Sequence, residues 1–273
     1  MSFGGLGPTP YPRGVSLPRL ASLDSLRDVA GSGHRTRDGG RVRRHVVYRS
    51  GELQLTDEDT LALVGLGLTA IHDLRTAEEV AAHPDAVIPG AAWRHYDVAG
   101  IPMDDLIDLP DEPTATALME RVYRSFVEDA GSRRAFGALL ARLASPPASQ
   151  PDGPQLVHCT TGKDRAGWAA ALLLAVAGVP EDAVFEDYLR TNECSRVSRG
   201  RYLTMVGAAL GEEMVPVYER VLVADERYLR VAWEAAGTAY GSLEGYLIHG
   251  LGLETAVLER LRQRLTGECD EEP

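Results

Sequence analysis

The residues best suited to chemistry lie in one short stretch, 158–166, which reads His-Cys-Thr-Thr-Gly-Lys-Asp-Arg-Ala. A short apolar run precedes this stretch, and a long apolar run, 166–179, follows its arginine. Cys159 supplies a nucleophilic sulfur, and Arg165 supplies parallel N–H groups that fit two oxygens of a tetrahedral oxyanion. Gly162 allows the backbone between them to curl, so that successive amides point inward as an anion-binding nest.

The surroundings of this stretch predict a covalent phosphoryl-transfer site. A loop between a strand and a helix lies at the carboxyl end of the strand, where ligands bind in open α/β sheets. The start of the following helix adds partial positive charge that favours an anion. A cysteine in this setting is expected to ionise readily, and the thiolate is its nucleophilic form. We therefore predict that Cys159 and Arg165 are catalytic and that the phosphate is held by Thr160, Thr161, Gly162, Lys163, Asp164 and Arg165.

Other interpretations of the loop are weaker. A nucleotide-binding P-loop needs a glycine five residues before Gly162, where Val157 stands, and a Ser or Thr where Asp164 stands. A sulfurtransferase loop usually has fewer residues between its cysteine and its arginine. A buried, inert cysteine is common, but it does not explain why Gly, Lys, Asp and Arg all fall within the next six positions.

The motif H-C-x-x-G-K-D-R resembles the signature loop of the cysteine-dependent protein tyrosine phosphatases. It is most similar to the bacterial tyrosine/serine branch, some members of which also accept phosphoinositides. The stretches 48–51 (Tyr-Arg-Ser-Gly), 73–75 (Asp-Leu-Arg) with Glu78, and 187–192 (Asp-Tyr-Leu-Arg-Thr-Asn) are similar to that branch as well. The resemblance covers about residues 15–265, nearly the whole chain.

This resemblance implies a fold and an activity. The fold would be α/β and protein-tyrosine-phosphatase-like, with a small, mostly parallel central sheet flanked by helices and a helical C-terminal elaboration. The activity would be hydrolysis of phosphomonoesters through a phosphocysteine intermediate. Phosphotyrosine is the expected substrate, and phosphoserine, phosphothreonine (dual specificity) and phosphoinositides stay open. The alternative is a catalytically weak pseudophosphatase that recognises phosphorylated partners, because Ala166 stands where the family usually has Thr or Ser.

A proton donor must protonate the leaving oxygen, and two aspartates are candidates. Asp73 follows a predicted strand and should lie at the same sheet edge as Cys159. Its other predicted role is a salt bridge with Arg75 or the cap of a helix over 76–82. Asp164 lies within the loop, and three roles stay open for it: the acid, a group that orients the substrate, or the partner of Lys163. A separate acidic run is interpreted as a solvated loop, with a mobile acid-bearing flap as the alternative: Asp104, Asp105, Asp108 and Asp111.

The remaining residues of the stretch are assigned supporting roles. His158 and Ala166 are assigned to structural support of the loop, since a thiolate needs no general base. Lys163 is the only lysine among 28 basic residues. A lysine is usually solvated, but here we favour the rim of the phosphate pocket, where it would add positive potential or contact a second phosphate. Cys194 is interpreted as incidental, or as a partner that traps oxidised Cys159.

The elements that must position these residues follow from apolar patterning. Strands are predicted at 46–49, 69–74, 93–98 and 155–158. Besides the buried helix over 166–179, helices are predicted at 56–66, 114–128, 132–143, 181–191, 195–210, 225–239, 242–249 and 254–265. Strands alternating with helices favour an α/β layer with a mostly parallel sheet. We predict one domain over 15–267, between an extended arm (1–14) and an acidic tail (268–273), with 195–240 as core or as a helical lid.

Composition excludes several classes of protein. The chain of 273 residues is 44% hydrophobic and 25% charged, as in globular proteins. Its 28 basic and 40 acidic residues give a net charge of −12, which disfavours nucleic acid and anionic membranes. The few cysteines and the lack of a leader or membrane-spanning pattern predict a cytoplasmic protein without stable membrane insertion. We predict no metal and no other cofactor, and the expected partners are a phosphorylated protein or lipid substrate and inorganic phosphate as product.

Overall fold

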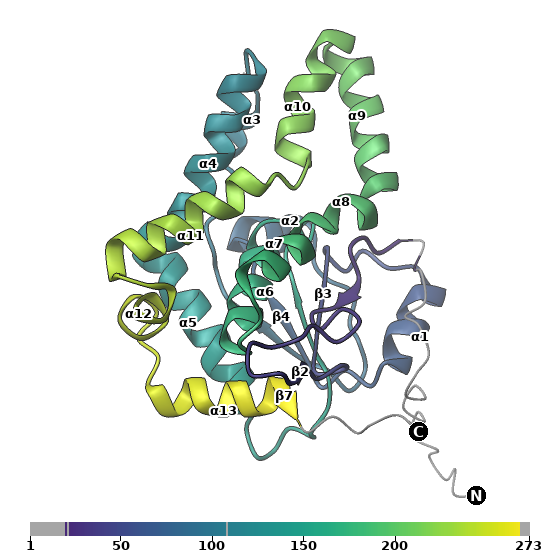
Figure 1. The fold of residues 1–273 in the computed structure, drawn as a ribbon. Coiled ribbons are helices and arrows are strands. Elements are labelled where there is room, and N and C mark those ends of the chain that lie inside the picture. The colour runs from purple at the N-terminus through teal and green to yellow at the C-terminus, as the bar shows by residue number, and fades with distance from the viewer. Residues whose placement is uncertain (1–19, 21, 108, 268–273) are drawn as a thin grey trace, which may run out of the picture.

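A five-stranded sheet lies at the centre of the computed structural model, which describes residues 20, 22–107 and 109–267 (Figure 1). Its order is β1-β3-β6-β4-β5. The bounds are β1 Arg27–Asp28, β3 Val47–Ser50, β4 Ala70–Asp73, β5 Ala92–His95 and β6 Gln155–His158. Strands β3, β6, β4 and β5 are parallel to one another, and β1 pairs antiparallel at the edge. The predicted mostly parallel α/β sheet is confirmed.

Helices surround this sheet. Before β6 they are α1 Asp57–Gly65, α2 Ala77–Ala82, α3 Met103–Ile107, α4 Glu112–Glu128 and α5 Ala130–Ala144. After β6 they are α6 Arg165–Val176, α7 Glu181–Leu189, α8 Thr191–Cys194, α9 Arg196–Leu210, α10 Val215–Leu222, α11 Glu226–Tyr240, α12 Leu243–Gly245 and α13 Thr255–Leu265. A 3₁₀ helix (Glu212–Met214) and a π-helix (Tyr246–Gly250) complete the set, and β2 Arg41–Val42 pairs with β7 Thr266–Gly267.

The two faces of the sheet pack against different partners because side chains alternate along a strand. Tyr48, Ile71 and Leu156 are paired neighbours on β3, β4 and β6, and they pack together with the residues around α1. Val157 on the other face joins the larger core, which is built from α4, α5, α6, α7, α11 and α13. Helix α6 is buried along almost its whole length, as its apolar sequence predicts.

The helices α9 and α10 form a hairpin that stands out from this body, at the same end of the molecule as α3 and α4 (Figure 1). Within α9 no residue is buried. The sequence predictions omit α10, whose first turn contains Pro216, a position at which proline is tolerated. Among the described helices none is long and apolar enough to cross a membrane.

Some predicted elements differ from the structure. Three members of the acidic run belong to helix starts and not to a loop: Asp104 and Asp105 lie in the first turn of α3, and the Asp111 carboxylate accepts the backbone N–H of Thr114 at the start of α4. An acidic residue at a helix start stabilises the unpaired N–H groups there, which explains the difference. The fourth member of the run, Asp108, lies outside the described residues, as do the predicted arm (1–14) and tail (268–273).

Two helical glycines allow a matched test of the packing. A Cβ on Gly137 in α5 would lie 2.4 Å from the backbone oxygen of Leu251, whereas a Cβ on Gly237 in α11 would meet nothing within 4 Å. We expect Gly137→Ala to destabilise the protein by about 1–3 kcal/mol through overpacking. Gly237→Ala should stabilise it by about 0.5–1 kcal/mol through helix propensity. Urea unfolding measures both, and equal effects would contradict the close approach at Gly137.

Candidate active site

Cys159 emerges from the middle of the sheet. It follows β6, which lies between β3 and β4, with Ser50 and Asp73 paired to His158 on either side. Helix α6 then begins at Arg165, so residues 159–165 form the complete connection, which we call the signature loop. The Cys159 side chain is only 1% exposed. The carboxyl edge of the sheet therefore places the sulfur where parallel α/β folds bind ligands.

The backbone of the signature loop is fixed by its contact with the end of β3. Gly162 has φ +70°, and a Cβ there would lie 2.5 Å from the carbonyl carbon of Ser50. The carbonyl oxygen of Thr160 accepts the N–H of Glu52 at 3.0 Å, and that of Gly162 accepts Nη2 of Arg49 at 2.7 Å. Since C=O and N–H point in opposite directions across a trans peptide, carbonyls turned toward β3 leave the amides of those units turned away from it. This is the backbone arrangement that an anion nest requires.

Arg165 is held by a carboxylate that the sequence predictions did not assign. Its Nη1 and Nη2 donate to the two oxygens of Glu79 at 2.5 and 2.8 Å, and Nη2 also donates to Oγ1 of Thr160 at 3.0 Å. Gly100 lies against the same guanidinium, where a Cβ would be 3.3 Å from Nη1. The sequence signal was the motif Thr76-Ala-Glu-Glu79, a capping box that starts α2 and orients the Glu79 side chain.

The two partners shift one another's pKa. Burial raises the pKa of Glu79, but its bonds to Arg165 outweigh burial and hold it at about 2. Burial lowers the pKa of Arg165, but Glu79 and the Cys159 sulfur outweigh burial and raise it. Both groups are therefore charged at neutral pH. A phosphate bound to this guanidinium has to share it with Glu79.

Asp73 lies in a buried ion network next to the loop. Its carboxylate accepts Nε and Nη2 of Arg75 at 3.0 and 2.8 Å, and its side chain is 0% exposed. Arg75 also pairs with Asp85 at 2.8 Å, and Asp85 pairs with Nε2 of His158 at 3.0 Å. Asp73 thus occupies the salt bridge that was its other predicted role. Both oxygens of the Asp73 carboxylate are thus bonded to Arg75.

The same network contains a group of side chains with the spacing of metal ligands. Within the described residues, Asp73, Asp85 and His158 each place one ligand atom within 4.8 Å of the others. The Arg75 guanidinium is already ion-paired with both carboxylates and supplies the positive charge that such a cluster needs. We therefore describe it as an ion network that supports β4 and the start of the signature loop.

Lys163 and Asp164 point toward the helical elaboration. Lys163 is 3% exposed, so it lies neither in solvent nor at an open rim. Its Nζ donates to the backbone oxygens of Val221 and Val223, the latter at 3.1 Å, and lies 3.2 Å from Oδ1 of Asp164. The same Oδ1 accepts the hydroxyl of Tyr123 at 2.8 Å. The Asp164 side chain keeps 13% of its surface exposed, more than Asp73 does.

The other predicted positions are less informative. Thr161 is partly exposed in the loop, and Ala166 is buried in the first turn of α6. Cys159 and Cys194 are both free thiols, the first buried and the second exposed at the end of α8. Cys269 lies outside the described residues.

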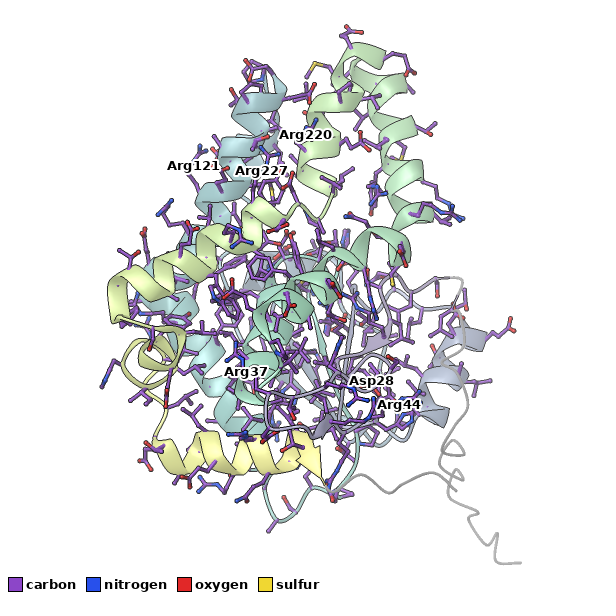
Figure 2. All side chains as sticks on the ribbon, viewed as in Figure 1. Asp28, Arg37, Arg44, Arg121, Arg220 and Arg227 are labelled. Atoms are coloured by element: carbon purple, nitrogen blue, oxygen red, sulfur yellow. The ribbon has the colours of Figure 1, made fainter. Side chains whose placement is uncertain are left out.

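An open cleft of about 600 Å³ lies elsewhere, between α4 and the segment from α10 to α11. Arg220 and Arg227 line it and lie close together in Figure 2. Each is neutralised by a neighbouring carboxylate: Arg220 by Glu112 at 2.7 Å and Arg227 by Asp225 at 2.6 Å. Both guanidiniums of the cleft are therefore compensated, and the cleft lacks, among the described residues, the backbone nest that distinguishes the loop after β6.

A cysteine and an arginine that bracket a nest of amides at a helix start define the class of cysteine-dependent phosphatases. The chain belongs to the tyrosine phosphatase family, whose sequence pattern matches residues 18–267. It is 30% identical to the triple specificity protein phosphatase PtpB of Mycobacterium tuberculosis, over 93% of this chain and 100% of that protein. A putative tyrosine-protein phosphatase of Cupriavidus necator is 30% identical over 89% of this chain and 86% of its own length. The predicted family and fold are thereby confirmed.

The ion pair at Glu79 predicts a pH dependence of stability. A carboxylate whose pKa is depressed in the folded state, here to about 2 from 4.5, stabilises the fold above its unfolded pKa. That contribution to stability is lost as the pH falls from the unfolded pKa of 4.5 to the folded pKa of about 2. We expect the difference in unfolding free energy between wild type and Glu79→Gln to shrink from pH 5 to pH 2. Urea unfolding at several pH values measures it, with the exposed neighbour Glu78→Gln as control; a difference independent of pH would contradict the ion pair.

Proposed function

We propose that this protein hydrolyses phosphomonoesters, with phosphotyrosine as the first substrate to test, through a phosphocysteine on Cys159. The observation that carries the proposal is the backbone of the signature loop: the carbonyls of Thr160 and Gly162 are bonded to Glu52 and Arg49, so that the amides of the same two peptide units face the other way. Such a nest, at the start of a buried helix, stabilises three phosphate oxygens and the charge that develops on them during transfer. Membership of the tyrosine phosphatase family supports the same reaction.

The first chemical step is attack by the Cys159 thiolate on phosphorus, in line with the leaving oxygen. The sulfur–phosphorus bond forms, the phosphorus–oxygen bond breaks, and the leaving oxygen takes a proton from an aspartic acid. Water then attacks the phosphocysteine, which releases inorganic phosphate and the thiolate. Arg165 would donate hydrogen bonds to two equatorial oxygens of the phosphate. Glu79 fixes the position of the Arg165 guanidinium by accepting hydrogen bonds from its Nη1 and Nη2.

We propose Asp164, in place of Asp73, as the general acid. Asp164 belongs to the signature loop and keeps part of its side chain exposed, whereas Asp73 is enclosed and bonded to Arg75. The Tyr123 hydroxyl and the Lys163 ammonium fix the orientation of its Oδ1 and leave Oδ2 for the proton. A positioned acid is worth typically 10²–10⁴-fold in rate.

The identities of the nucleophile and its clamp are tested by two substitutions. Cys159→Ser should abolish hydrolysis of p-nitrophenyl phosphate while inorganic phosphate still binds, because the amides and Arg165 remain. Arg165→Lys should lose activity by about 100-fold, since a point charge does not replace a bidentate fork. Steady-state rates and calorimetric phosphate binding measure these effects. Substantial turnover in Cys159→Ser would refute the covalent mechanism.

The acid is tested through the leaving group. Asp164→Asn should slow hydrolysis of an alkyl phosphate more than that of p-nitrophenyl phosphate, because p-nitrophenol departs without a proton. Asp73→Asn is the matched control. It should lower the stability by about 3–5 kcal/mol, because it leaves Arg75 partly unpaired, without a dependence on the leaving group. If Asp73→Asn shows the leaving-group pattern instead, the assignment returns to Asp73.

A further inference from the structure

A second guanidinium lies directly behind the signature loop. Arg49 belongs to the Tyr-Arg-Ser-Gly stretch of β3, and its side chain is 1% exposed. Its Nη2 donates to the backbone oxygens of Gly162 at 2.7 Å and of Lys163 at 3.3 Å. Gly167, in the first turn of α6, leaves room for it: a Cβ there would lie 3.0 Å from the same Nη2. The position of Arg49 on β3 and the missing Cβ of Gly167 thus together allow the Arg49 guanidinium to lie against the loop.

The charge of Arg49 is only partly compensated. Its Nη1 lies 3.7 Å from Asp187, and Nη2 of Arg27 lies 3.7 Å from the same carboxylate, which His34 also approaches at 3.5 Å. One carboxylate therefore faces two guanidiniums. Within the described residues, Nε of Arg49 and Nη1 of Arg27 have no hydrogen-bond partner. Burial lowers the pKa of Arg49 to about 10, so the group is still a cation at neutral pH.

The other charges near Cys159 are compensated or negative. Arg165 is paired with Glu79, so this pair sums to zero. Asp164 lies against Lys163 and balances its charge only when the Asp164 carboxyl is ionised. On the β4 side, the guanidinium of Arg75 is paired with the carboxylates of Asp73, Asp85 and Glu52. His158 lies against Asp85 in the same network. Burial raises the pKa of Tyr123 and Tyr188 well above the usual value, so both stay neutral. Among the described residues, a surplus of positive charge therefore remains in the group Arg27, Arg49 and Asp187, whatever the protonation state of Asp164.

We propose that Arg49, held by Asp187, is the positioning residue of this site: it turns the loop carbonyls away from the phosphate and supplies positive charge that stabilises a thiolate on Cys159. Arg49 acts through the loop and does not contact the reacting atoms. The inference rests on the proposed function only in taking Cys159 as the nucleophile. It assigns a role to the stretches at 48–51 and 187–192, which the reaction itself does not use.

The test is the pH profile of Cys159 alkylation by iodoacetamide in the full-length protein, followed by mass spectrometry of the Cys159 peptide. Arg49→Gln keeps N–H donors but removes the charge, and should move the midpoint upward by about one pH unit. Arg49→Lys keeps the charge and should stay closer to wild type. Asp187→Asn removes the counter-charge and should move the midpoint downward. If Arg49 and Asp187 had a purely structural role, Arg49→Gln and Asp187→Asn would move the midpoint in the same direction.

Arg27→Gln is the matched control, because Arg27 faces Asp187 but its hydrogen bonds go to Asp187 and Thr191 rather than to the loop. It should move the midpoint upward by less than Arg49→Gln. Circular dichroism confirms folding, and if Arg49→Gln does not fold, Arg27→Gln and Asp187→Asn carry the test. An upward shift in Asp187→Asn, or an unchanged profile in folded Arg49→Gln, would overturn the inference. Because alkylation needs no turnover, failure of the proposed hydrolysis would show separately, as an inactive wild type with an intact alkylation profile.

Discussion

The close contact between Gly162 and the backbone of Ser50 is the constraint on which the site depends. A side chain at position 162 would overlap that backbone, so only glycine allows the loop to lie against the end of β3. From this contact follow the bonds from Glu52 and Arg49 to the loop carbonyls, and hence the direction of the amides. The parallel pairing of β3 with β6 brings the two segments together in the first place. The direction of the loop amides thus follows first from the sheet topology and from the missing Cβ of Gly162.

Charge is then distributed by pairing. A chain with a net charge of −12 would repel a phosphate ester at long range, so the attraction must be local and largely buried. Each cation of the loop has its own carboxylate: Glu79 for Arg165 and Asp164 for Lys163. Buried charges require such partners, because desolvation of an isolated ion costs several kcal/mol. The partners also keep the guanidinium and the ammonium in fixed positions, and the surplus charge is left to the group around Arg49.

The sequence allowed the sheet, the buried helix α6 and the loop to be predicted, because each depends on local signals: apolar runs, a glycine and the cysteine–arginine spacing. It did not identify Glu79 as the partner of Arg165, since that contact joins α2 to α6 across 86 residues of sequence. The capping box at Thr76 was visible, but only the folded chain shows what lies beyond it. The sequence left the choice between Asp73 and Asp164 open for the same reason, because the pairing of Asp73 with Arg75 inside the protein is a tertiary property.

Lys163 shows how the helical elaboration is tied to this site. Its ammonium binds Val221 in the last turn of α10 and Val223 at the end of that helix, where the helix dipole and unpaired carbonyls favour a cation. Asn192 in α8 binds the backbone of Ala224 from both its oxygen and its nitrogen. A compact ammonium with three donors suits carbonyls that converge from different directions better than a planar guanidinium does. This explains why the one lysine of an arginine-rich chain stands here, and it ties the junction of α10 and α11 to the signature loop.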